Sequence, residues 1–182
     1  MRRFLSKGIP NFNRVLLVES GSRQLFEDLL RDLYKVHPHM RADLLTCFAG
    51  VPDHYRADRG SVYRVGDYRG SRARRKLYAE LKSNRYDVTG VICAAQPIMT
   101  RWKWMVAARV PAKVFVLNEN GDYFWLDRGH LGIIRQFISF RAGLSGAGAV
   151  RTLARLAAFP FALLYLVLYA ATVHFRRKLR TL

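Results

Sequence analysis

The feature that most constrains this chain is an uncharged run near its C-terminus. Residues 156–173 read LAAFPFALLYLVLYAATV and contain no charged side chain. At about 1.5 Å per residue, a helix over this run extends about 27 Å, close to the thickness of a bilayer core. A helix of this length in a soluble core normally keeps a polar stripe, which this run lacks. The run therefore predicts a membrane helix, the alternative being a buried core helix.

Basic residues flank this run on both sides, so the positive-inside rule leaves its orientation open. A tail anchor would place only residues 175–182 across the bilayer. A re-entrant or in-plane helix would keep both flanks on the anionic cytoplasmic leaflet. In either case six flanking cations are expected at the membrane surface: Arg151, Arg155, Arg176, Arg177, Lys178 and Arg180.

The whole chain is basic as well as apolar. Its 182 residues include 31 Lys and Arg against 13 Asp and Glu, a net charge of +18, and 51% are hydrophobic. Such a chain is expected to bind a polyanion, either nucleic acid or an anionic membrane. Sequence motifs of nucleic-acid binding are missing, so anionic lipid is the expected partner. The most basic run, residues 69–76, either adds to that contact or forms a solvated helix face.

Apolar runs and helical patterns alternate through the first 130 residues. This alternation with short connections predicts an open, mostly parallel Rossmann-like α/β sheet with helices on both faces. Ser22 is placed to cap the first helix. The expected strands are residues 15–18, 42–48, 62–65, 87–93 and 113–117, and the expected helices are residues 23–34, 72–83 and 97–109.

The sequence divides into four parts. A basic segment, residues 1–12, precedes the α/β domain of residues 13–130. Residues 131–150 comprise an amphipathic helix and a run of small residues that suits either close helix packing or a flexible linker. Residues 151–182 form the apolar helix with its flanks. Because no signal peptide opens the chain, we expect the main domain on the cytoplasmic side of the inner membrane, with Cys47 and Cys93 as free thiols.

The search for a site begins where the predicted strands end, because ligands of parallel sheets bind beyond the carboxyl ends. Glu19 ends the first strand and is a candidate general base, or else the partner of a nearby arginine. Ser20, Gly21, Ser22 and Arg23 follow, and free backbone N–H groups at this helix start favour an anion. An ordinary strand–helix turn has the same pattern.

A second polar cluster follows the fifth strand. Asn118, Glu119, Asn120 and Asp122 lie beside three aromatic residues. Mixtures of hydrogen-bonding groups and aromatic faces bind sugars and sugar phosphates, and Asp122 is a second catalytic candidate. The alternative is a tight Asn-Gly-Asp turn with the aromatic rings packed beneath it or at the membrane interface. The histidines and cysteines lack the spacing of a metal site, so no metal or other cofactor is expected.

The order of elements resembles the N-terminal, acceptor-side domain of the heptosyltransferase-like GT-B glycosyltransferases. The similar segments lie within residues 13–127 and read RVLLVES, RADLLTCFAG, VYRVGDYRG, NRYDVTGVICAAQ and RWKWMVAARVPAKVFVLNENG. Family members carry a Gly-Asp pair at the start of the first helix, where this chain has Gln24 and Leu25. The donor-binding second domain of that family has no counterpart here, since the apolar tail follows residue 130.

The resemblance implies a membrane-associated glycosyltransferase-like protein of envelope glycan or glycolipid assembly. It would be the acceptor-side half of a split transferase or a non-catalytic relative. Its partners would then be a lipid-linked acceptor and a separate nucleotide-sugar-binding subunit. The alternative function is a non-enzymatic, membrane-anchored scaffold or interaction module.

Overall fold

The computed structural model describes residues 11–94, 96–142 and 148–180. The chain divides into two compact units, Met1–Leu131 and Gly132–Leu182. The first unit is an α/β domain, and the second is helical.

A six-stranded sheet forms the α/β domain, with the strand order β3-β2-β1-β4-β5-β6. The first five strands pair in parallel, and β6 pairs antiparallel with β5. This confirms the prediction of a mostly parallel α/β sheet. The strands are β1 (Arg14–Val18), β2 (Arg41–Thr46), β3 (Val62–Arg64), β4 (Val88–Cys93), β5 (Lys113–Asn118) and β6 (Tyr123–Trp125).

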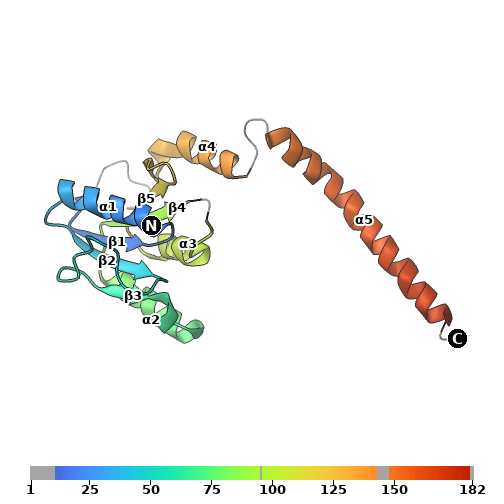
Figure 1. Cartoon of the computed structure of the whole chain (residues 1–182), viewed down its shortest axis with the longest axis horizontal. Coiled ribbons are helices and arrows are strands. Elements are labelled where there is room, and N and C mark those ends of the chain that lie inside the picture. The colour runs from blue at the N-terminus through green and yellow to red at the C-terminus, as the bar shows by residue number, and fades with distance from the viewer. Residues whose placement is uncertain (1–10, 95, 143–147, 181–182) are drawn as a thin grey trace. The chain divides into compact units, whose positions relative to one another are not determined.

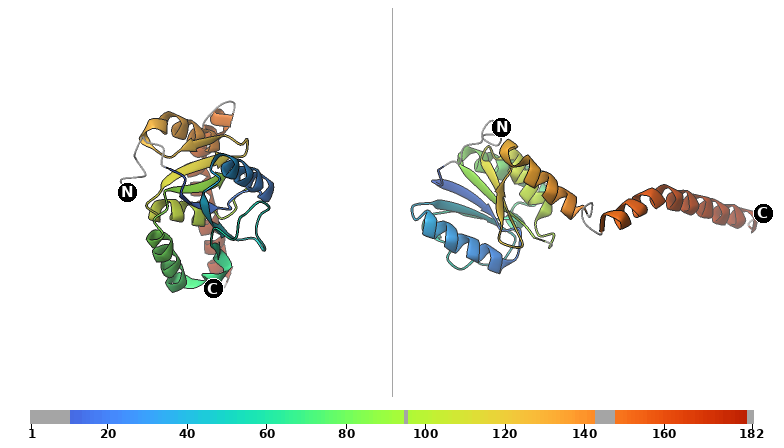
Figure 2. Two further views of the ribbon diagram at one scale, coloured as in Figure 1. Left: turned by 90° about the vertical axis from the view of Figure 1, so that its left-hand side faces the viewer. Right: turned by 90° about the horizontal axis from the view of Figure 1, so that it is seen from above.

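Helices cover the two faces of this sheet unequally (Figures 1 and 2). Helix α1 (Arg23–Val36) packs on one face, while α2 (Gly70–Ser83) and α3 (Thr100–Arg109) pack on the other. The chain moves outward from β1 to β3 and then returns across the sheet to β4 and β5. Because parallel crossovers are right-handed, reversing the direction of travel places the helices on the opposite face.

The core follows directly from the apolar runs of the sequence. Strands β1 and β4 are buried almost along their whole length, as expected for central strands covered on both faces. Helix α1 buries Phe26, Leu30 and Tyr34, which recur at a four-residue spacing on one stripe. Leu77 and Leu81 of α2 repeat this spacing on the other face.

Strand β6 was not predicted, because residues 118–127 have the composition of a polar loop. Gly121 adopts a φ of +82° in the turn that joins β5 to β6, a backbone conformation that favours glycine. Phe115 then pairs with Trp125 across the two strands. Phe124 and Trp125 are buried, whereas Tyr123 is exposed.

The helical unit consists mainly of α4 (Leu131–Arg141) and α5 (Gly148–Arg180). Within α5, residues Ala154–His174 have a mean hydropathy of 2.1, and none of this span is buried. By length and composition this helix can cross a membrane. Pro160 lies inside α5 without ending it.

Several predicted segments fall outside the described residues. Of the six cations expected at the membrane surface, Arg155 is exposed. The side chains of the other five (Arg151, Arg176, Arg177, Lys178 and Arg180) lie outside the described set, as do residues 1–10 of the basic segment and residues 143–147 of the small-residue run.

Candidate functional site at the carboxyl edge of the sheet

The predicted site lies where the strand order reverses, between β1 and β4. There the chain leaves β1 toward α1 on one face and leaves β4 toward α3 on the other. In open parallel sheets this divergence is where ligand crevices form. Residues 19–23 follow β1 at this edge, and residues 118–122 begin at the end of β5.

Glu19 is fully buried, and its carboxylate is engaged by neighbours. The Thr46 hydroxyl donates to Oε2 at 2.5 Å, and Arg23 Nε donates to Oε1 at 3.0 Å. Burial raises the pKa of the Glu19 carboxyl, while Thr46 and Arg23 act against that rise. The structure therefore contains the arginine ion pair that was the alternative to a free general base.

Arg23 joins three segments of this edge. Besides Glu19, its guanidinium donates to the carbonyl oxygens of Val51 at 3.2 Å and Ala49 at 3.5 Å. It also lies 5.3 Å from the centroid of the Phe48 ring. The predicted N-cap is confirmed, since the Ser22 hydroxyl accepts from the Leu25 N–H at 3.4 Å. About a third of the Arg23 side chain is exposed, which leaves it within reach of a ligand.

Ser20 and Gly21 are parts of the core at the junction of β1 and β4. The Ser20 hydroxyl accepts from Ile92 N at 3.0 Å and donates to Ile92 O at 2.9 Å. A Cβ at Gly21 would collide with the Ile92 side chain, so only glycine allows this close approach. Both residues therefore have a structural explanation.

We expect Ser20→Ala to destabilise the α/β domain by about 1–3 kcal/mol, because it leaves the buried Ile92 N–H without its acceptor. Chemical denaturation of the full chain in detergent measures the change. Ser71→Ala, at an exposed position of α2, is the matched control and should stay within about 0.5 kcal/mol of the wild type. Equal stability of the two variants would contradict the structural role of Ser20.

The second cluster is a β-hairpin turn held by Asn118. Asn118 Oδ1 accepts from the backbone N–H groups of Asn120 and Asp122, both at 2.9 Å. Asn118 Nδ2 donates to Asp122 Oδ2 at 3.2 Å. Glu119 and Asn120 are exposed at the tip. This is the tight turn that was the alternative to a sugar site, and two of its three aromatic residues pack into the core.

The two clusters lie at one edge of the sheet, at the ends of different strands. Strand β4 separates β1 from β5. Arg23 bonds to Glu19, Val51 and Ala49, and Asn118 bonds to Asn120 and Asp122 within its own turn. A ligand that touches both clusters would have to cross the end of β4.

Lys103 is a buried cation at this edge that the sequence analysis missed. The side chain lies on the buried stripe of α3, and Nζ donates to Ile92 O at 2.8 Å. The same carbonyl oxygen accepts from Ser20. Its position four residues before Ala107 and three before Val106 matches the helical spacing of the buried face, a signal that was available in the sequence.

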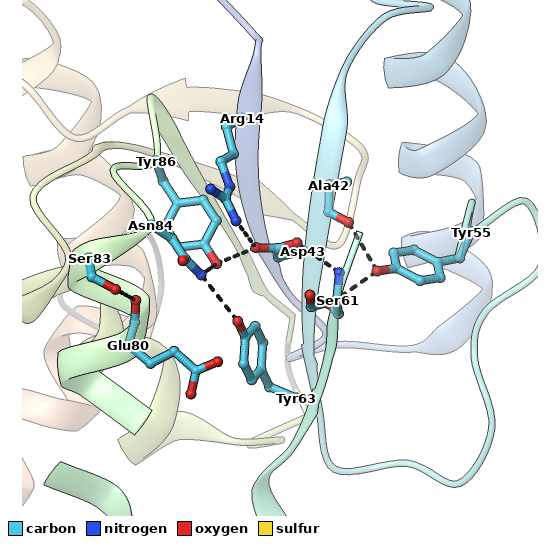
Figure 3. Close-up of polar contacts among 10 residues, drawn as sticks. All are labelled: Arg14, Ala42, Asp43, Tyr55, Ser61, Tyr63, Glu80, Ser83, Asn84 and Tyr86. Atoms are coloured by element: carbon cyan, nitrogen blue, oxygen red, sulfur yellow. Dashed lines mark hydrogen bonds and ion pairs between the residues drawn. The ribbon is translucent and has the colours of Figure 1, made fainter. Parts of the chain in front are cut away.

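A buried polar network lies toward the opposite, amino edge of the sheet (Figure 3). Asp43 accepts from the Tyr86 hydroxyl at 2.5 Å, from Ser61 N at 2.8 Å and from Arg14 at 3.4 Å. Asn84 donates to the hydroxyls of both Tyr86 and Tyr63. Burial raises the pKa of both phenols, so both are neutral, and Tyr86 is the one that donates to Asp43. In the sequence, this network was indicated by Asp43, a charged residue inside the apolar strand ADLLT.

A second buried ion pair closes the end of the domain. Asp127 Oδ2 lies 3.1 Å from Lys113 Nζ, and Asp127 Oδ1 lies 2.7 Å from His130 Nδ1. Burial alone would raise the pKa of Asp127, but His130 and Lys113 outweigh it and hold the pKa below its usual value. Lys113 Nζ also lies 4.9 Å from the centroid of the Trp125 ring.

A groove of about 860 Å³ runs along α1 on its face of the sheet. Leu25, Leu29 and Leu33 form one wall, and Phe115, Leu117 and Trp125 form the other. Phe12 closes one end by stacking on the His37 ring at 4.2 Å between centroids. Gly121 and Tyr123 line the other end of the groove, which therefore lies beside the hairpin turn.

Within the described residues, no three His, Cys, Asp or Glu side chains gather as a metal site requires. The chain matches no protein-family model, no curated protein and no solved structure.

Proposed function

We propose that this protein is a membrane-anchored, Rossmann-like acceptor domain that serves glycosyl transfer to a lipid-linked glycan. The observation that carries the proposal is the unburied apolar span Ala154–His174. It occurs in the same chain as a parallel sheet whose strand order reverses between β1 and β4. An anchor of this kind would hold the α/β domain at the surface where lipid-linked glycans are found.

The carboxyl edge supports acceptor binding more than proton transfer. Arg23 and the start of α1 offer donors suited to a phosphate or sugar hydroxyl. Both carboxylates first considered for catalysis are held within the domain, Glu19 by Thr46 and Arg23 and Asp122 by Asn118. We therefore assign acceptor binding to this chain, and a separate donor-binding subunit would supply the nucleotide sugar.

The same engagement of Glu19 and Asp122 favours a second candidate, a membrane-anchored interaction module without transfer activity. In that case the groove along α1 would serve protein contacts, and the carboxyl edge would carry no substrate. The two functions differ in whether the cell's lipid-linked glycans depend on this chain.

Mass spectrometry of lipid-linked glycans from a deletion strain tests the proposal. We expect a glycan shortened by at least one sugar, restored by the wild-type chain. Arg23→Gln, which removes the partly exposed charged donor at this edge, should lower the restored glycan by about threefold to tenfold if one hydrogen bond to the acceptor is lost. Asp32→Asn, at an exposed position of α1, is the control and should restore it fully.

Unchanged glycans in the deletion strain would overturn the transfer function. A shortened glycan that Arg23→Gln restores fully would instead assign the chain a scaffold role. Immunoblots at equal loading keep a loss of protein from being read as a loss of function.

A further inference from the structure

On one face of the sheet, the charged residues of the two covering helices are nearly all basic. Helices α2 and α3 together contain eight basic residues, of which Lys103 is buried, and one acidic residue, Glu80. Helix α1 on the opposite face contains three basic and three acidic residues. A surface evolved only for solubility mixes both signs, so the asymmetry indicates an anionic partner on the α2–α3 side.

The exposed sides of these helices form one continuous surface. Arg109 of α3 lies 4.6 Å from the centroid of the Tyr78 ring of α2, and this ring lies 5.9 Å from that of Trp102. Figure 2 shows both helices on the same side of the sheet. Their spacing aligns the outward residues in stripes. We define the α2–α3 face by Arg72, Arg75, Lys82, Arg101, Trp104 and Met105.

Exposed apolar side chains stand among these cations. Trp104 is 41% exposed and Met105 is 38% exposed. Tryptophan is enriched at the level of the lipid headgroups, where one side of the ring is apolar and the N–H meets water. Cations beside an exposed indole therefore match the chemistry of an anionic bilayer surface.

We propose that the α2–α3 face docks the α/β domain onto anionic phospholipid headgroups. This inference rests on the proposed function only in that α5 holds the domain near a bilayer. Each Lys or Arg at such a surface strengthens association by about fivefold, and Trp104 and Met105 enter the interface. Docking turns α1 and its groove away from the bilayer, and the carboxyl edge then opens alongside the headgroups.

Site-specific fluorescence on the full chain in vesicles tests this orientation. In a Cys47→Ser background, an environment-sensitive dye is attached at Ala108→Cys on α3 or at Asp32→Cys on α1. Cys93 is buried and stays unlabelled. We expect emission at position 108 to rise severalfold when phosphatidylglycerol is added to phosphatidylcholine vesicles, with no rise at position 32.

Charge variants sharpen the test. Arg72→Gln/Arg75→Gln/Arg101→Gln should lower the ratio of docked to undocked domain on the order of 100-fold, at about fivefold per cation. Arg31→Gln/Lys35→Gln removes two cations from α1 on the opposite face and, as the control, should leave this ratio unchanged. Vesicle flotation, which reports α5, should be the same for every variant, so a failure of the anchor is separated from a failure of docking.

Equal emission changes at positions 108 and 32, or none on adding phosphatidylglycerol, would overturn the proposal. Binding of single-stranded RNA through the same three arginines, with no dependence of docking on phosphatidylglycerol, would also overturn it. Docking that persists in a protein whose deletion leaves glycans unchanged would support this inference and contradict the transfer function.

Discussion

Asp127→Asn is expected to destabilise the α/β domain by about 3–5 kcal/mol, because it removes the carboxylate partner of a buried ammonium. The Lys113 and Asp127 side chains are 2% and 1% exposed. Water therefore cannot solvate the Lys113 ammonium once its carboxylate partner is removed. Urea denaturation of the full chain in detergent measures the loss. Asp32→Asn, whose carboxylate is 72% exposed, should change stability by less than about 0.5 kcal/mol.

The pH dependence follows from the lowered pKa of Asp127. A carboxyl group whose pKa is depressed on folding stabilises the fold above its unfolded pKa, near 3.8. That contribution is lost as the pH falls through the folded value. The wild type should therefore lose stability on acidification more steeply than Asp127→Asn.

A charge-free replacement separates the ion pair from the packing. Lys113→Met/Asp127→Leu should recover most of the stability lost in Asp127→Asn, since replacing a buried pair by apolar groups is often neutral. If Asp127→Asn were as stable as the wild type, the pair would contribute nothing to the fold.

Much of the fold could be predicted because it depends on local patterns. Val15 to Val18 form an unbroken apolar run that only a central strand buries fully, and Ser22 precedes a four-residue apolar spacing. Strand β6 escaped prediction because three residues after an Asn-Gly-Asp turn carry too short a pattern. Pairing with β5 alone makes them a strand.

The state of the candidate site could not be predicted, because it depends on partners far apart in the chain. Glu19 was identified from its place after a strand, but its carboxylate accepts a hydrogen bond from Thr46, 27 residues away. Asp43 meets Tyr86 across 43 residues. Residue types alone did not distinguish such buried, neutralised groups from reactive ones.

Leu163→Arg/Val167→Arg is expected to release the protein from membranes. Each arginine near the centre of a membrane helix costs about 2.5–3.5 kcal/mol, so two together lower partitioning by roughly 10⁴-fold. Both positions lie within Ala154–His174, where no side chain is buried to shelter the charge. Carbonate extraction of membranes should move the variant into the supernatant, and Leu163→Ala/Val167→Ala should stay in the pellet.

The form of the helix favours spanning over lying in the membrane plane. At about 1.5 Å per residue, the 21 residues of this span extend about 31 Å, the thickness of a bilayer core. An in-plane helix needs a polar side facing the headgroups, and residues 156–173 have no charged residue to form one. Retention of the double-arginine variant in carbonate-washed membranes would show that the α/β domain, and not α5, holds the chain there.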